Sequence, residues 1–211
     1  MKIAIIGQGG HSKVIRDLIQ SDGRMQIAGY FDDKYEEVSI QGSSFFGPVL
    51  SARKMLNYFD EIKFVVAIGN NKARKLIVEK LGLADEDYAI LKHQSAMISP
   101  SAEIGHGTVI MPHSVINADT RIGCHAIINT SSVIEHDNKL GDFVHVSPSA
   151  TLTGSVVIDE GVHIGAGAVI IPNIKIGEWS IIGAGATVIN NIPSHCTAVG
   201  IPAKVRLIKI T

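Results

Sequence analysis

Residues 110–145 have the sequence IMPHSV INADTR IGCHAI INTSSV IEHDNK LGDFVH, in blocks of six that each begin with an aliphatic residue. The same spacing runs from Ile98 to Val188 and finds an aliphatic residue at all sixteen of its positions, without an insertion. An amphipathic α-helix would repeat its apolar residues at steps of three and four, and a half-buried β-strand at steps of two. A strict step of six predicts a solenoid of hexapeptide repeats.

The residues around the aliphatic position indicate the shape of this solenoid. Glycine often follows directly, as at Gly105, Gly123 and Gly141, where we expect a tight corner to need its conformational freedom. Three hexads would form one coil of a triangular prism, with the aliphatic side chains pointing inward and stacked on their copies in the next coil. The predicted fold of residues 98–193 is a left-handed parallel β-helix of about five coils, about 25 Å long at about 4.8 Å between stacked strands. The fourth residue after the aliphatic one is mostly small or compact: Ala102, Thr108, Ser114, Thr120, Ala126, Ser132, Ala150, Ala168, Ser180 and Ala186.

The composition limits the kinds of partner. The chain has 211 residues, with 19 basic and 20 acidic side chains and a formal net charge of -1. Because there is no excess of Lys and Arg to neutralise phosphates, we expect no general binding to nucleic acid or to a membrane surface. Gly7 interrupts the apolar run at the N-terminus. Because this run is too short, we expect neither a secretory signal nor a membrane span there. The two cysteines, Cys124 and Cys196, are typical of a reduced cytoplasm, where we expect the protein to be located.

The first 93 residues predict a Rossmann-like α/β domain. A buried strand over 2–6 is followed by Gly7, Gly9 and Gly10 and then by an apolar pattern typical of a helix. A glycine turn between a strand and a helix lets a phosphate approach the backbone, and the helix N-terminus attracts negative charge. Only part of a dinucleotide fingerprint is present, because Lys13 stands near the place of the third glycine, and the small domain suits a nucleotide sugar better. The alternative is a glycine turn that only packs a helix against a strand.

Two further strands bring polar residues to the same edge of this sheet. A strand over 27–31 ends in Asp32 and Asp33, whose carboxylates can accept hydrogen bonds from a ribose or a base. A strand over 63–68 ends in Gly69. Because open α/β sheets bind ligands at the carboxyl ends of their strands, we expect the nucleotide at this edge.

Taken together, the two halves resemble one family. Its members are bacterial nucleotide-sugar N-acetyltransferases of the bacillosamine and perosamine type, which use acetyl-CoA to acetylate a 4-amino-4,6-dideoxy sugar. The related sialic acid O-acetyltransferases share this architecture. The resemblance covers essentially the whole chain, with residues 194–211 as a C-terminal tail. The segments that carry it are 7–13 with Asp32 and Asp33, 67–71, 116–118, 128–137 and 199–204.

The resemblance implies catalytic residues around one hexad. His136 would be the general base, because the amine must lose a proton as it attacks the thioester and an imidazole titrates in the right range. Asp137 would orient the imidazole and raise its basicity, although many members of the family have glutamate there. Asn129 matches a position near the reacting centre and would hydrogen-bond to the amine or the sugar. The hexad of His136 is also the most polar one after its aliphatic start, as expected of a functional departure from a repeat.

The resemblance also implies where the two substrates bind. The residues expected to contact acetyl-CoA lie on the solenoid: His145, Gly154, Ala166 and Ala184. The residues expected to contact the nucleotide sugar, with UDP favoured over GDP, lie in the first domain: Gly9, Gly10, His11, Asp32, Asp33 and Gly69. Such prisms usually assemble as homotrimers, which would bury their flat β faces.

Three alternatives remain open at this point. The first is an O-acetyltransferase, whose acceptor is a sugar hydroxyl, as in sialic acid, and which needs the same base. A nucleotide-sugar-binding trimer without activity would not need His136. A metal-dependent carbonic anhydrase on the same prism needs three histidines on zinc. Here His145 and His163 are eighteen residues apart and should stack, and a third ligand is missing, so we expect no metal.

Overall fold

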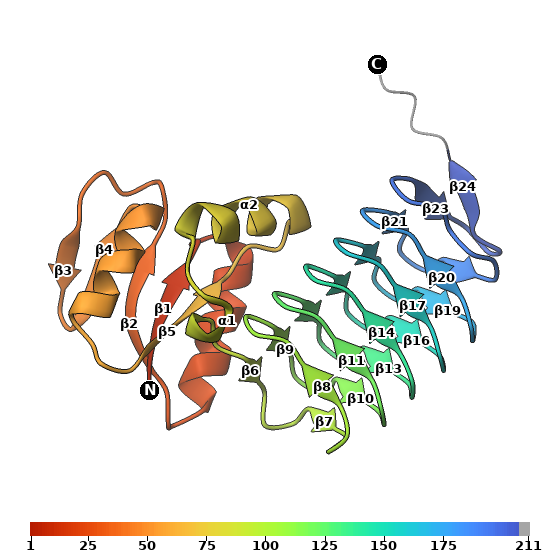
Figure 1. Cartoon of the computed structure of the whole chain (residues 1–211), viewed down its shortest axis with the longest axis horizontal. Coiled ribbons are helices and arrows are strands. Elements are labelled where there is room, and N and C mark those ends of the chain that lie inside the picture. Colours follow the sequence, from red (N-terminus) through yellow and green to blue (C-terminus); the bar gives the residue numbers. More distant parts are fainter. Residues whose placement is uncertain (207–211) are drawn as a thin grey trace. The chain divides into compact units, whose positions relative to one another are not determined.

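The computed structural model describes residues 1–206, which fall into two compact units, each with its own hydrophobic core (Figure 1). The first unit is Met1–Leu91, and the second begins at Lys92. Residues 207–211 of the predicted C-terminal tail lie outside the described residues. Within residues 1–206, no helix is long and apolar enough to cross a membrane.

The first unit is built on a five-stranded sheet with the strand order β3-β4-β2-β1-β5. Its elements are β1 (Lys2–Ile6), α1 (Gly10–Ser21), β2 (Gln26–Phe31), β3 (Ser39–Gln41), β4 (Ser44–Gly47), the 3₁₀ helix η1 (Val49–Asn57), β5 (Ile62–Val66), α2 (Asn71–Leu81) and the 3₁₀ helix η2 (Asp85–Asp87). Strands β4, β2, β1 and β5 run parallel, and β3 is antiparallel to β4. Because β2 and β5 pair with opposite sides of β1, the strand order reverses there, which is where doubly wound sheets bind ligands. The predicted Rossmann-like arrangement is confirmed.

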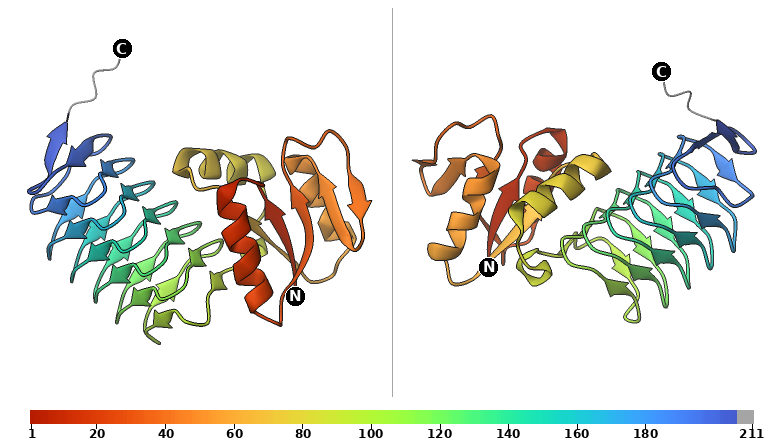
Figure 2. Two further views of the ribbon diagram at one scale, coloured as in Figure 1. Left: turned by 180° about the vertical axis from the view of Figure 1, so that it is seen from behind. Right: turned by 45° about the horizontal axis from the view of Figure 1, so that its top comes forward.

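Helices cover both faces of this sheet (Figure 2). On one face, Ala4 and Ile6 of β1 share a core cluster with residues of η1 and α2. Successive side chains of a strand point to opposite faces, so Ile3 and Ile5 point to the other face, which α1 covers with its buried side. Burial on both faces explains why β1 is apolar throughout, and it leaves the strand ends as the accessible part of the sheet.

The second unit is a parallel β-helix in which each coil contributes one short strand to each of three sheets (Figures 1 and 2). The first sheet contains β7 (Met97–Ile98), β10 (Val115–Ile116), β13 (Val133–Ile134), β16 (Thr151–Leu152), β19 (Val169–Ile170) and β22 (Thr187–Val188). The second contains β8 (Glu103–Ile104), β11 (Arg121–Ile122), β14 (Lys139–Leu140), β17 (Val157–Ile158) and β20 (Lys175–Ile176). The third contains β6 (Leu91–Lys92), β9 (Val109–Ile110), β12 (Ile127–Ile128), β15 (His145–Val146), β18 (His163–Ile164), β21 (Ile181–Ile182), β23 (Thr197–Val199) and β24 (Lys204–Arg206).

The strand pairing confirms the predicted phase of the repeat. Strands of successive coils pair in register at a spacing of eighteen residues, as Ile128 does with Val146. Fourteen of the sixteen hexad aliphatic residues are buried in one continuous core. The other two, Ile98 and Ile104, pack partly buried against it. The column of aliphatic side chains therefore fixes which residues lie above one another in successive coils.

The prediction that glycine supplies the corner conformation directly after the aliphatic residue is wrong. The left-handed conformation occurs two residues further on, mostly at residues other than glycine, as at Asp137 (φ 60°). A Cβ atom at Gly105 would lie 2.5 Å from the carbonyl carbon of Gly123, and one at Gly141 would lie 2.8 Å from the amide nitrogen of Glu160. These glycines are therefore required by the close approach of adjacent coils rather than by their own dihedral angles.

Replacement of Ile128 by Asp tests this core. Ile128 is completely buried, so Ile128→Asp would place an unpaired carboxylate among aliphatic side chains. We expect it to lower the free energy of unfolding by at least about 4 kcal/mol, measured by chemical denaturation. The control is Ile189→Asp, because Ile189 is 42% exposed and its replacement should change the same quantity by less than about 1 kcal/mol. A wild-type midpoint for Ile128→Asp would contradict the assigned phase.

Candidate active site

A histidine and an aspartate form a hydrogen-bonded pair at the corner that follows β13. Nδ1 of His136 lies 2.7 Å from Oδ2 of Asp137, and the two side chains are 60% and 56% exposed. Asp137 has the left-handed backbone conformation, so the chain turns directly at this pair. With Nδ1–H donating to the carboxylate, the neutral ring presents an unprotonated Nε2 as its proton acceptor.

The surroundings of His136 favour its protonated form. The hydrogen bond to Asp137 is the main cause that raises the pKa of His136 above its ordinary value, and the negative charges of Asp137 and Glu135 act in the same direction. Glu135 is itself held in place, because its Oε2 accepts a hydrogen bond from Nδ2 of Asn117 (2.8 Å). His136 is therefore a stronger base than an isolated imidazole.

Gly154 lies directly against this imidazole, eighteen residues further along the solenoid. A Cβ atom at this position would lie 2.7 Å from Cε1 and 2.8 Å from Nε2 of His136. Only glycine leaves room for the ring where it stands. The resemblance assigned Gly154 to the pantetheine arm, whereas the neighbour that it has in the structure is His136.

A second pair of candidate residues lies at the neighbouring corner. Nδ2 of Asn129 is 3.2 Å from Nε2 of His145, and Oδ1 of Asn129 accepts a hydrogen bond from the backbone N–H of Thr130 (2.9 Å). Because Oδ1 is engaged by Thr130, the amide nitrogen is the atom that faces the imidazole, which accepts at Nε2. Asn129 thus holds His145 in one orientation and one tautomer.

The same corner continues over two further coils without large side chains. Ala166 follows β18 and Ala184 follows β21, and both are exposed. Each precedes a glycine, Gly167 or Gly185, with a φ of 64° or 66° and open space where a Cβ atom would stand. The corner therefore has an edge on which nothing larger than a methyl group projects from these four positions.

The structure divides the predicted residues of the solenoid between two corners. The first corner follows strands of the first sheet and contains His136, Asp137 and Gly154. The second corner follows strands of the third sheet and contains Asn129, Ala166 and Ala184, with His145 on the adjoining strand β15. Within one chain, the flat face of the first sheet separates the two corners.

The histidine pair of the carbonic anhydrase alternative lies on adjacent coils, with the two rings tilted by 43° instead of stacked face to face. The rings of His145 and His163 lie on paired strands with their centroids 4.7 Å apart. Nε2 of His163 is 3.0 Å from Oγ of Ser147. This contact is the equivalent, one coil later, of the contact between His145 and Asn129. Within residues 1–206, no group of three His, Cys, Asp or Glu side chains is placed to hold a metal ion.

In the first unit, the glycine loop after β1 packs against the loop after β5. Gly7 has a φ of 92°, and a Cβ atom there would lie 2.8 Å from Cγ1 of Ile68, so glycine is required at this point. Gly9, Gly10 and Gly69 instead have open space where a side chain would stand. Gly9 is also the N-cap of α1 and has no side chain to bond the first N–H groups of the helix. The backbone of both loops is therefore open at the carboxyl edge of the sheet.

His11 and Arg74 form the polar interior of this edge. Nε2 of His11 is buried and has no hydrogen-bond partner among residues 1–206. Burial and, to a smaller extent, the positive charge of Arg74 lower the pKa of His11 to about 4, so its imidazole is neutral at pH 7. The buried guanidinium of Arg74 donates to the carbonyl oxygens of Ile68 (2.9 Å) and Gly69 (3.3 Å) and to Oδ1 of Asn71 (3.0 Å). Arg74 thus holds the loop after β5 in shape.

Asp32 and Asp33 are engaged in internal hydrogen bonds. Oδ2 of Asp32 accepts from the backbone N–H of Gln8 (2.6 Å), which ties the end of β2 to the glycine loop. Oδ1 of Asp32 accepts from the backbone N–H of Lys34, and Oδ1 of Asp33 from that of Val49, both at 3.1 Å. Each carboxylate oxygen has two lone pairs, so both residues keep acceptor capacity for a ligand. The glycine loop, His11, Gly69 and Asp32 therefore come together at one edge of the sheet.

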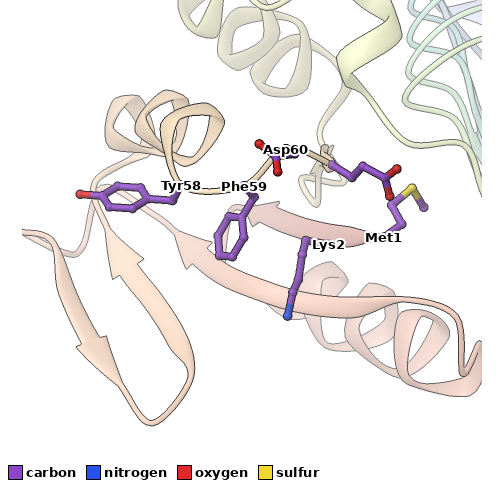
Figure 3. Close-up of a pocket in the computed structure, with 6 residues that line it drawn as sticks. Met1, Lys2, Tyr58, Phe59 and Asp60 are labelled. Carbon is purple, nitrogen blue, oxygen red and sulfur yellow. The ribbon is translucent and has the colours of Figure 1, made fainter.

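A hollow of about 440 Å³ lies elsewhere in this unit (Figure 3). It lies at the amino edge of the sheet, because Lys2 is the first residue of β1 and Glu61 directly precedes β5. The predicted nucleotide residues follow the carboxyl ends of the same strands, and none of them lines this hollow. Its lining residues are Met1, Lys2, Tyr58, Phe59, Asp60 and Glu61.

Two features that support the candidate site were not predicted from the sequence. The sequence gives no indication that Arg74 is buried, because an arginine in a helix is ordinarily an exposed residue. The Asn117–Glu135 hydrogen bond does have such an indication, since the two residues are eighteen apart and must lie on adjacent coils. The repeat length alone places these two residues beside each other.

Asp137→Asn tests the electrostatics of the His136 corner. The carboxylate favours the charged imidazolium, so its replacement by a neutral amide should lower the pKa of His136 toward the ordinary value of about 6.5. NMR titration of protein labelled at histidine Cε1 measures this pKa directly. Asp119→Asn is the matched control, since Asp119 has the same left-handed corner position one coil earlier. An unchanged pKa in Asp137→Asn would show that the carboxylate does not act on the ring.

Two family models match the chain. The model described as the PglD N-terminal domain matches residues 2–81, and that described as bacterial transferase hexapeptide (six repeats) matches residues 155–190. The UDP-N-acetylbacillosamine N-acetyltransferase of Bacillus subtilis (strain 168) is 47% identical over 109 residues, which are 52% of this chain and 50% of that protein. The match thus spans half the length of this curated relative.

Solved structures match nearly the whole chain. PerB from Caulobacter crescentus, in complex with CoA and GDP-perosamine, has 34% sequence identity and a TM-score of 0.87, covering 98% of each chain. The acetyltransferase domain of PglB from Neisseria gonorrhoeae FA1090, in complex with acetyl coenzyme A, has 36% identity and a TM-score of 0.84, covering 97% of this chain and 98% of its own. Because sequence and fold agree over this length, the protein belongs to the family of hexapeptide-repeat nucleotide-sugar N-acetyltransferases of the bacillosamine and perosamine type.

Proposed function

We propose that the protein transfers the acetyl group of acetyl-CoA to the 4-amino group of a nucleotide-linked 4-amino-4,6-dideoxy sugar, with His136 as the general base. The observation that carries this proposal is the hydrogen bond from Nδ1 of His136 to Asp137, which leaves Nε2 at an exposed corner as a proton acceptor. The similarity to PerB, whose structure contains CoA and GDP-perosamine, supports the choice of substrates.

The reaction proceeds by direct attack of the sugar amine on the thioester. As the new C–N bond forms, Nε2 of His136 takes a proton from the amine, and Asp137 stabilises the imidazolium that results. The tetrahedral oxyanion then collapses, the C–S bond breaks, and the imidazolium returns the proton to the departing thiolate, which leaves as CoA. No covalent intermediate with the protein is needed.

Acetyl-CoA lies along the second corner in this proposal. The exposed edge at Ala166 and Ala184 suits a slender pantetheine arm, because no large side chain obstructs it. His145 meets the acetyl end, and Asn129, which bonds to His145, hydrogen-bonds to the amine or the sugar. Gly154 accommodates the imidazole of His136, since a Cβ atom at this position would collide with Cε1 and Nε2.

The nucleotide binds at the carboxyl edge of the sheet in the first unit. The open backbone at Gly9, Gly10 and Gly69 and the uncapped N-terminus of α1 suit a diphosphate. The neutral imidazole of His11 lies at this edge beside the sugar nucleotide, and Asp32 contacts the nucleobase together with its neighbour in sequence, Asp33. We favour a UDP-linked sugar, because the Bacillus subtilis relative is a UDP-N-acetylbacillosamine N-acetyltransferase.

A homotrimer completes the site in this proposal, because the base and the cofactor edge lie at different corners of one chain. The charges of the prism faces support such an assembly. In each strand of the second sheet, the residue before the inward aliphatic one is mostly charged: Glu103, Arg121, Lys139, Val157 and Lys175. The corresponding residues of the first sheet carry no charged group: Met97, Val115, Val133, Thr151, Val169 and Thr187. An uncharged flat face is favourable to bury against another copy.

The assembly is tested by the mass of the protein in solution. We expect sedimentation equilibrium to give three times the chain mass of 22.5 kDa. Val133→Glu would place a charge in the centre of the uncharged face and should shift the protein toward the monomer, whereas Val157→Glu on the charged second sheet should not. A wild-type monomer that acetylates its acceptor would contradict a site shared between copies.

The acceptor is tested by thiol release from acetyl-CoA. The panel contains UDP- and GDP-linked 4-amino-4,6-dideoxy sugars, their 4-hydroxyl counterparts and free sialic acid. Turnover limited to the UDP-linked amine is expected. Turnover on the hydroxyl compounds alone would support the O-acetyltransferase alternative. Binding of a UDP sugar without thiol release would support the alternative of a binding trimer without activity.

His136→Ala tests the proposed base. We expect kcat to fall by about 10² to 10⁴, the usual contribution of a positioned general base, with the oligomeric state unchanged. His195→Ala is the matched control, because His195 forms a similarly exposed pair with Glu178 (3.3 Å) at another corner. More than a tenth of the wild-type kcat in His136→Ala would remove this residue from the mechanism.

A further inference from the structure

Asn138 is completely buried in the hexad position that most coils give to a small or apolar side chain. It is the fourth residue after Ile134, and the equivalent residues one coil before and one coil after are Thr120 and Val156. A primary amide in such a position has to find its hydrogen-bond partners inside the prism. Where those partners lie determines what the residue does.

The amide nitrogen of Asn138 links two adjacent coils. Nδ2 donates to the carbonyl oxygens of Glu135 (2.6 Å) and Thr153 (2.9 Å), and it lies 3.3 Å from that of His136. The carbonyl of Glu135 belongs to the same planar peptide unit as the N–H of His136. The carbonyl of Thr153 belongs likewise to the peptide unit of Gly154. One buried side chain therefore joins the peptide of His136 to that of the glycine against which its imidazole lies.

We infer that Asn138 is a positioning residue for His136, which it holds against Gly154 so that Nε2 keeps a fixed direction at the corner. The inference rests on the proposed role of His136 as the base. Because the side chain of Asn138 is fully buried, it acts through the backbone of the corner and not by contact with a substrate.

A comparison with Ser114 indicates what the asparagine adds. Ser114 has the same hexad position at another corner, and its hydroxyl, with a single hydrogen, lies within hydrogen-bonding distance of the two equivalent carbonyls, those of Met111 (2.9 Å) and Asn129 (3.0 Å). Asn138 makes both links and also reaches the carbonyl of His136, but its Oδ1 is buried without a partner among residues 1–206. An unpaired buried acceptor destabilises a fold, and such departures from the rules of a repeat are typical of functional sites.

Three variants separate positioning from stability. Asn138→Val removes the donor and introduces the residue that stands at the equivalent position 156. Asn138→Ser keeps a hydroxyl that can reach both carbonyls, as Ser114 does. Thr108→Val is the matched control, because it removes a buried hydroxyl that donates to the carbonyl of Gly123 (2.9 Å) at a corner without candidate site residues.

Kinetics with acetyl-CoA and a UDP-linked 4-amino-4,6-dideoxy sugar provide the first measurement. Asn138→Val should lower kcat by about 10- to 100-fold and change KM for acetyl-CoA by less than about 3-fold, because the base and not the cofactor edge is misplaced. Asn138→Ser should keep at least about a third of the wild-type kcat, and Thr108→Val should change it by less than about 2-fold.

NMR titration of His136 provides a second measurement that needs no acceptor. In Asn138→Val, the pKa of His136 should fall toward about 6.5, because a loosened corner weakens the hydrogen bond to Asp137. Wild-type kcat together with a wild-type titration in Asn138→Val would overturn the inference. So would an equal loss of kcat in Thr108→Val, or no recovery in Asn138→Ser. If His136→Ala keeps its activity while the titration still shifts in Asn138→Val, the proposed base is wrong and the positioning by Asn138 stands.

Discussion

The inward column of aliphatic side chains determines the position of every other residue in the second unit. Because each coil contains eighteen residues, burial of Ile134 and Leu152 on top of one another forces His136 to lie over Gly154. The same register places Asn117 beside Glu135. The polar contacts of the candidate site are therefore consequences of an apolar repeat, and the repeat tolerates them because they lie at corners, outside the core.

The hexad of His136 departs from its neighbours both inside and outside the prism. Outside, it presents a histidine and two carboxylates, of which Asp137 forms the hydrogen bond that makes the imidazole more basic. Inside, it replaces a small or apolar residue by Asn138. A polar exterior alone would need no amide in the interior, since the equivalent positions of other corners hold apolar residues or small hydroxyls, as at Val156, Thr120 and Ser114. The change on both sides of one short segment indicates that the backbone between them has to be held.

The sequence predicted most of the fold because the strongest signal, a strict six-residue period, depends only on burial. It could not predict why Gly105 is glycine, because that reason is a contact between coils and not a dihedral angle. His136 was predicted through a resemblance between motifs, whereas its contact with Gly154 required the geometry of the corner. Arg74 could not be predicted either, because its partners Ile68 and Gly69 are backbone carbonyls, which carry no sequence signal.

The separation of the proposed base from the proposed cofactor edge places a constraint on how copies of the chain can associate. A rotation axis parallel to the solenoid leaves the height of every residue along it unchanged. Asn129 precedes His136 by seven residues, and His145 follows it by nine. Both separations are at most half a coil, so the three residues lie at nearly the same height along the prism. A displacement of one copy by a single coil would move His136 by about 4.8 Å, from hydrogen-bonding range to beyond it. The proposed trimer can therefore form productive sites only if its copies are aligned coil for coil, and the uncharged face between the two corners is the surface whose packing sets that alignment.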